Sequence, residues 1–109
     1  MSDLDVKIQE VADYWDYNMP MMAAEELAEA IQAISKVERA NDEYIRAEGI
    51  DDPKVADAGW YMVEKCLDEF KDDIRDVYIS IRALMYYYNI EDDIMERVEE
   101  KLNKKYKED

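Results

Sequence analysis

Two pairs of acidic residues in this sequence share the same spacing. Glu26 and Glu29 lie in the stretch "EELAEAIQAISK", and Asp73 and Asp76 lie in "DDIRDVYISI". Residues three positions apart occupy one face of a helix, so each pair would present two neighbouring carboxylates. Carboxylate oxygens are preferred ligands of Mg²⁺ and Mn²⁺, and carboxylates that converge repel one another unless a cation neutralises them. If the two helices pack together, the pairs predict a shared divalent-cation site suited to phosphoryl chemistry on a nucleotide.

The alternative interpretation is that these acids are solvated surface residues, because Asp and Glu occupy 29 of the 109 positions. Their placement favours a site. Each of the four acids immediately precedes an apolar residue of its helix, which puts both pairs in the same angular band beside the apolar stripe. Neither band contains Lys or Arg, so we expect no local ion pair to account for the acids.

The elements that must position these acids are predicted to be helices. Apolar residues recur at helical spacing, and the sequence contains only 2 Gly and 2 Pro. This pattern predicts no strands and four helices, at about residues 4–17, from Pro20 to just before Gly49, at 63–88 and at 91–106. Asp52 and Pro53 could cap and start the third helix earlier, and the pattern leaves open whether 54–62 joins it, because Gly59 weakens a helix there. We expect one all-α domain, 1–109, in which residues 48–62 form an insertion or a loop.

Two of these helices carry the clearest apolar stripes and should form the core. The stripe of the second helix comprises Ala23, Leu27, Ala30, Ile34 and Val37. The stripe of the third helix comprises Val63, Leu67, Phe70, Ile74, Val77, Ile81, Leu84 and Tyr88. The latter covers about 39 Å of helix at 1.5 Å per residue. The remaining segments are too short to cover all of it, so we expect at least a homodimer.

Charge and composition exclude several functional classes. A net charge of −15 repels a phosphate backbone, so we expect no binding to a nucleic-acid polymer. The absence of His excludes Ser-His-Asp and Cys-His catalysis and any His-ligated zinc. No apolar run approaches the roughly 20 residues of a membrane span, and the start "MSDLDVKIQE" does not resemble a signal peptide. The single cysteine, Cys66, excludes an intramolecular disulfide and indicates a cytoplasmic protein.

The acidic motifs resemble those of the MazG-like, all-α nucleoside triphosphate pyrophosphatases. The hallmark of that family is Glu-Glu-x-x-Glu on one helix and Glu-x-x-Asp on a later one. The first motif is intact as "EELAE", residues 25–29, and the second is present as "DIRD", residues 73–76, with Asp73 where the family more often has Glu. The lead-in "NMPMMAAEELAE" and the stretch "LNKKY", residues 102–106, are also similar to the family pattern. The spacer between the motifs is longer than usual, which is why residues 48–62 are interpreted as an insertion.

This resemblance implies a four-helix MazG-like bundle that is completed by oligomerisation, as a homodimer or homotetramer. It also implies hydrolysis of a nucleoside triphosphate to the monophosphate and pyrophosphate. Mg²⁺, with Mn²⁺ as an alternative, would be held by Glu26, Glu29, Asp73 and Asp76, and one of these carboxylates would serve as general base. Asp73 is one methylene shorter than Glu, and Glu69, one turn earlier, could supplement it.

Four further residues are candidates for substrate binding: Trp15, Asn18, Asn103 and Lys105. Lys105 could offset phosphate charge, and the alternative for it is a lysine-rich helix end. Trp15 could stack on a base, and Asn18 could hydrogen-bond that base. Trp15 also continues the apolar stripe of the first helix, which favours a place in the core.

Two other functions are consistent with the same residues. One is a related all-α pyrophosphatase specific for dUTP or phosphoribosyl-ATP, which a substrate panel would distinguish. The other is a non-enzymatic helical interaction module whose acids only solubilise it, in which case Mg²⁺ would not change the melting temperature. The sequence leaves open the base and sugar of the nucleotide, and whether the nucleotide is normal or damaged.

Overall fold

The computed structural model describes residues 2–106, with side chains described as far as Lys104. These residues form four α-helices and no strands, which confirms the predicted all-α class. The helices are α1 (Asp3–Trp15), α2 (Met19–Glu48), α3 (Pro53–Tyr88) and α4 (Glu91–Tyr106), with a short 3₁₀ helix, η1 (Asp16–Asn18), between α1 and α2. Within this part of the chain, no helix has the length and apolar content that crossing a bilayer requires.

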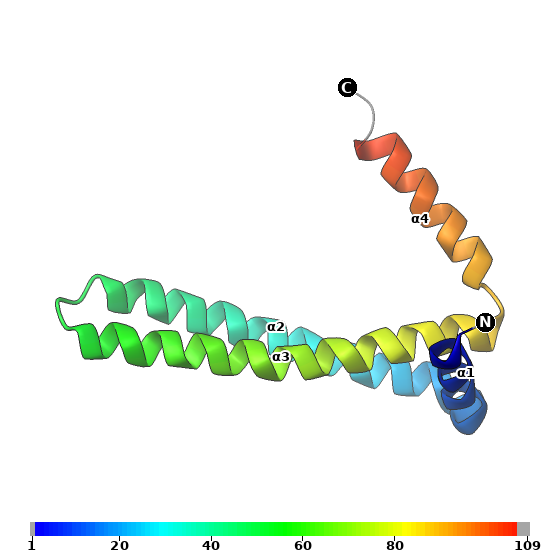
Figure 1. Ribbon diagram of the computed structural model, residues 1–109, viewed down its shortest axis with the longest axis horizontal. Helices are drawn as coiled ribbons and strands as arrows, with labels where there is room; N and C mark the ends of the chain where they lie inside the picture. Colours follow the sequence, from blue (N-terminus) through cyan, green and yellow to red (C-terminus); the bar gives the residue numbers. More distant parts are fainter. Residues whose placement is uncertain (1, 107–109) are drawn as a thin grey trace.

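The two longest helices, α2 and α3, pack against each other as an antiparallel hairpin (Figure 1). The loop between them is short, Gly49–Asp52. A proline at the first helical position and the Asp52 carboxylate, which accepts a hydrogen bond from the backbone N–H of Lys54 at 3.0 Å, start α3 directly after this loop. Residues 53–62 are therefore helical, and the loop expected within 48–62 is confined to its first few residues.

Small side chains line the seam where α2 meets α3. Beyond its first residue, Met19, the buried residues of α2 are all alanines: Ala23, Ala30, Ala33, Ala40 and Ala47. The facing helix has a glycine in contact with α2, where a Cβ on Gly59 would lie 3.4 Å from the Cα of Tyr44. Small side chains at the contact allow the two helix axes to run close together.

The core stripes predicted from the sequence are confirmed at Ala23, Ala30 and Val63, which are buried, but are wrong at four larger residues. Leu27 and Ile34 are 40 % and 50 % exposed, and Leu67 and Ile74 are 38 % and 42 % exposed. At these four positions the preceding residue is the less exposed one, so the seam there lies about 100° around the axis from the predicted residue. Close approach between two long helices favours the alanine face, so the larger residues are left on one side of the hairpin. We call this exposed surface the outer apolar face, formed by Leu27, Ile31, Ile34, Leu67, Ile74 and Tyr78.

Helix α1 packs at the end of the hairpin where α2 begins and α3 ends (Figure 1). The buried cluster at this junction consists of Ile8, Ala12, Met19, Ala23 and Ala83. The N-terminus of α1 is closed by a capping box, in which the Ser2 hydroxyl accepts from the N–H of Asp5 and the Asp5 carboxylate accepts from the N–H of Ser2. The cluster therefore anchors α1 to both hairpin helices.

Helix α4 projects away from the hairpin (Figure 1). Asn89 ends α3 in the left-handed conformation, with φ of 55°, and the chain turns there. The main contacts of α4 are with α3. Helices α1, α2 and α3 are thus joined in a bundle-like arrangement, while the expected four-helix MazG-like bundle is not confirmed.

One arginine of α3 links α1 and α4 to the hairpin. The Arg82 guanidinium donates to the Asp5 carboxylate at 2.5 Å and lies 3.5 Å from the Glu91 carboxylate. The hydrogen bond from Arg82, followed by those from Ser2, lowers the pKa of Asp5 from 3.8 to about 2. The depressed pKa means that the charged form of Asp5 favours the folded state.

Replacing Arg82 with Gln is expected to lower the melting temperature at pH 5–7 and to have a smaller effect in acid. In the wild type, the contribution of the charged Asp5 to the free energy of unfolding is present above its ordinary pKa of 3.8 and is lost as the pH falls through about 2. Circular dichroism melts from pH 2 to pH 7 measure this difference. Arg97→Gln is the matched control, because Arg97 makes an exposed ion pair with Asp93 inside α4. A pH-independent difference for Arg82→Gln would contradict the assignment.

Candidate functional site

The two predicted acidic pairs lie on facing helices, in the half of the hairpin nearer to α1. Glu26 and Glu29 belong to α2, and Asp73 and Asp76 belong to α3. The pKa of the Glu26 carboxyl is raised, first by burial and then by the negative charges of Glu29, Asp76 and Asp73. The structure therefore brings all four acids into one electrostatic neighbourhood.

One oxygen of this group has no partner among the described residues. The Oε2 atom of Glu26 is buried and makes no hydrogen bond. Glu26 occupies a seam position between Ala23 and Ala30, both of which are buried. A buried carboxylate oxygen without a donor is costly, and its cost is removed when a donor or a cation is supplied. The carboxylate thus lies among the buried alanines of α2 at the place where the acids meet.

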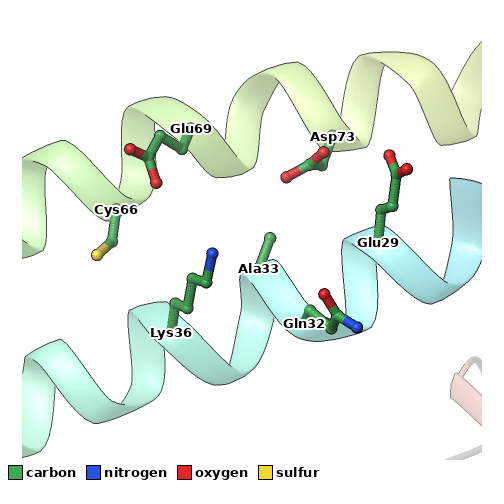
Figure 2. Close-up of a pocket in the computed structure, with 7 residues that line it drawn as sticks. All are labelled: Glu29, Gln32, Ala33, Lys36, Cys66, Glu69 and Asp73. Carbon is green, nitrogen blue, oxygen red and sulfur yellow. The ribbon is translucent and has the colours of Figure 1, made fainter.

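A pocket of about 190 Å³ opens between α2 and α3 beside these acids. We call it the acidic pocket, lined by Glu29, Gln32, Ala33, Lys36, Cys66, Glu69 and Asp73. In Figure 2, Glu29 extends from α2 toward α3, the Asp73 carboxylate points from α3 into the space between the helices, and Glu69 lies one turn along α3 from Asp73. Glu69 is therefore placed where it could supplement the shorter Asp73, and three carboxylates share one opening.

Lys36 is a pocket residue that the sequence analysis did not single out. Its side chain extends from α2 toward α3 (Figure 2). Lys36 follows Glu29 by seven positions, about two helical turns, so both side chains lie on one face of α2. The same spacing relates Cys66 to Asp73 on α3. Both residues could have been identified from the sequence by moving two helical turns from an acidic motif on the same face, forward from Glu29 and backward from Asp73.

Asp76 differs from the other three acids because it makes an ion pair. The Nε atom of Arg75 donates to its carboxylate at 3.0 Å, and Arg75 also lies 3.4 Å from Asp72. The expectation of no local ion pair is therefore wrong for Asp76. An arginine side chain is long enough to bend around the helix toward an adjacent residue. The Arg75 side chain is 62 % exposed, so this pair contributes little to stability.

The candidates for nucleotide binding are not gathered at the acidic pocket. Trp15 packs against the core cluster, as its place in the apolar stripe favours. Asn18 is exposed at the end of η1, and Asn103 is exposed on α4, which projects away from the hairpin (Figure 1). The side chain of Lys105 lies outside the described residues.

The donor set of the acidic pocket suits a hard divalent cation. Its charged oxygens all come from carboxylates, and the unpartnered oxygen of Glu26 lies beside them. Among the described residues, no three Asp, Glu or Cys side chains are placed to hold one ion together. Mg²⁺ commonly takes only one or two protein carboxylates and completes its shell with waters and substrate phosphates. The residues therefore fit Mg²⁺ bound in this manner and do not form an all-protein cage.

Replacing Glu26 with Gln is expected to raise the melting temperature of the metal-free protein at pH 7. The raised pKa shows that the charged form of Glu26 is disfavoured in the folded protein. The protonated side chain therefore adds to the free energy of unfolding below the ordinary pKa of 4.5, and this contribution is lost as the pH rises through the pKa of Glu26 in the folded protein. Melts in EDTA from pH 4 to pH 8 should show the advantage of the variant shrinking toward pH 4. The control is Glu10→Gln, on an exposed position of α1. An equal advantage at all pH values, or for both variants, would contradict this explanation.

Comparisons of the chain with protein-family models, with curated proteins and with solved structures find no match. The function is therefore inferred from the side chains of the acidic pocket between α2 and α3 and from the resemblance of the two acidic motifs to those of the MazG-like proteins. Of the predicted residues, the four acids are the ones that the fold brings together, and Glu69 and Lys36 join them in the acidic pocket.

Proposed function

We propose that this protein is a Mg²⁺-dependent nucleoside triphosphate pyrophosphohydrolase, with Mn²⁺ as an alternative cofactor. The observation that supports the proposal is the meeting of two acidic pairs across one groove, where a buried oxygen of Glu26 has no hydrogen-bond partner in the part of the chain that the structure describes. The resemblance of "EELAE" and "DIRD" to the MazG-like motifs names the reaction class. Carboxylates that repel one another in the free protein are well suited to bind a cation together with an anionic substrate.

When bound, the cation would neutralise the carboxylates and polarise the phosphate oxygens. Glu29 and Asp73, two of the carboxylates that line the opening, would hold it, and Glu69, Glu26 and Asp76 complete the negative surroundings. One of these carboxylates accepts a proton from the attacking water, whose oxygen forms a bond to the α-phosphorus. The bond from the α-phosphorus to the bridging oxygen breaks, and that oxygen keeps the electron pair as part of pyrophosphate. The products are a nucleoside monophosphate and pyrophosphate.

We further propose that a second copy of the chain covers the outer apolar face. Each residue of that face comes directly after a position of its own helix that faces the other helix. In an antiparallel pair, such positions on both helices lie on one side. A groove of about 660 Å³ continues this apolar surface between α3 and α4, where Tyr78, Ile81, Met85 and Met95 contribute to its lining. The carboxylates lie at the seam and on its other flank, so self-association would leave the acidic pocket open.

The exposed area of the single chain supports this assembly. The accessible surface is 8668 Å², whereas a compact monomer of this mass is expected to expose about 6,300 Å². The excess of roughly 2,300 Å² is comparable to the area that each partner buries in an obligate dimer. A homodimer or a homotetramer would remove this excess by covering the apolar residues of α2, α3 and α4.

The test of the proposed reaction is pyrophosphate release from each common NTP and dNTP with Mg²⁺. Release from several triphosphates, with the monophosphate as the other product, supports the proposal. Activity on dUTP alone or on phosphoribosyl-ATP alone would assign the chain to a more specific pyrophosphatase. No hydrolysis of any of them, together with no effect of Mg²⁺ on the melting temperature, would leave the helical interaction module as the function.

A further inference from the structure

The groove that contains the acidic pocket continues along the hairpin toward the Gly49–Asp52 loop. A second pocket of about 320 Å³ adjoins the first and shares Lys36, Cys66 and Glu69 with it. Along both helices, the residues of this second pocket lie closer to the loop than Glu29 and Asp73 do. One continuous groove therefore passes from the carboxylates to this neighbouring pocket.

The charge of the groove reverses at this point. Lys36, Arg39 and Lys65 line the second pocket, against the two acids Glu43 and Glu69. We call these three cations the basic cluster. They stand out in a chain whose net charge is −15.

The basic cluster is free to bind a ligand. None of its three residues takes part in an ion pair within the described residues, whereas Arg75, Arg82 and Arg97 are all paired. All three side chains are exposed. Their positive charges are therefore available to an anion that enters the groove.

We propose that the basic cluster binds the two terminal phosphates of the substrate, which become the leaving pyrophosphate. This inference rests on the proposed function for its placement beside the reaction centre. Carboxylates and a cation can bind one end of a triphosphate, but further phosphate charge placed near a strongly acidic protein would be repelled without local positive groups. The basic cluster supplies such groups in the same groove.

This assignment gives the substrate a direction in the groove. The α-phosphate lies at the acidic pocket, the terminal phosphates point toward the Gly49–Asp52 loop, and the nucleoside extends toward α1. Arg39 can bind two phosphate oxygens with its planar guanidinium, while Lys36 and Lys65 act as compact charges. Negative charge develops on the bridging oxygen as its bond to the α-phosphorus breaks, so cations at this end favour departure of pyrophosphate.

Binding of inorganic pyrophosphate in the presence of Mg²⁺ tests the basic cluster directly. Isothermal titration would compare the wild type with Lys36→Gln, Arg39→Gln and Lys65→Gln. Loss of one charge-assisted contact should weaken pyrophosphate binding by about tenfold or more. The matched controls are Arg46→Gln and Lys54→Gln, which remove a cation from the same hairpin outside both pockets and should bind within about twofold of the wild type. Lys36→Arg keeps the charge and should retain most of the affinity.

The outcomes separate this inference from the proposed reaction. If the wild type hydrolyses triphosphates but the basic-cluster variants bind pyrophosphate like the controls, the reaction stands and the inference is wrong. If the wild type does not bind pyrophosphate, the inference is also wrong. If the basic-cluster variants lose binding while no triphosphate is hydrolysed by the wild type, the pocket is a diphosphate site and the proposed reaction fails. Circular dichroism melts of each variant confirm that the compared proteins are folded.

Discussion

Glu29→Gln is expected to reduce Mg²⁺-dependent hydrolysis by about 100-fold or more and to remove most of the stabilisation that Mg²⁺ gives the wild type. Glu29 lines the acidic pocket and faces Asp73 across the hairpin (Figure 2). The substitution keeps the shape of the side chain and removes its charge. A ligand that binds only the native state stabilises it by about 2.7 kcal/mol at a hundredfold excess over Kd. For a domain of this size, that corresponds to a rise in melting temperature on the order of 10 °C.

The measurements are pyrophosphate release and thermal melts with and without millimolar Mg²⁺. Asp76→Asn should reduce both responses in the same direction, although it also frees Arg75 from its ion pair. The control is Glu10→Gln, an exposed acid of α1 outside the groove. If Glu10→Gln and Glu29→Gln respond alike to Mg²⁺, the ion acts on overall charge and the proposed site is wrong.

Ile74→Glu is expected to dissociate the proposed assembly into monomers. Ile74 is 42 % exposed in the single chain and lies at the junction of the outer apolar face with the apolar groove beside α4. A charge buried without a partner in an apolar interface is strongly unfavourable, and the excess negative charge of the chain adds repulsion. Leu27→Glu, at the other hairpin helix, should act in the same direction.

Sedimentation at micromolar concentration measures this effect. The wild type should sediment as at least twice the chain mass of 13.0 kDa, and Ile74→Glu should sediment near 13.0 kDa. Tyr14→Glu, at a residue of α1 that is 80 % exposed and outside the outer apolar face, is the matched control and should keep the assembly of the wild type. A wild-type chain that sediments as a monomer would contradict the proposed covering by a second copy.

Several features of the fold could be predicted from the sequence because they depend on neighbours in the chain. The absence of β-alternation and the scarcity of Gly and Pro indicate helices, and the structure is all-helical over its described residues. Pro20 and Pro53 fall at or next to helix starts, where the missing N–H is tolerated. The spacing within each acidic pair places its two carboxylates on one face, which needs only the helical period.

The sequence by itself determined that the chain is mostly helical and which acids pair on each helix, because both follow from local geometry, but it did not assign residues 53–62 to α3. Only the tertiary structure decided which face of α2 is buried, since the choice between the alanine face and the Leu27–Ile34 face depends on how closely α3 can approach. It also decided that Lys36 and Glu69 share a pocket with Glu29, because their meeting requires the register of the whole hairpin. The direction in which α4 leaves the hairpin likewise depends on the turn at Asn89, where α3 ends in the left-handed conformation.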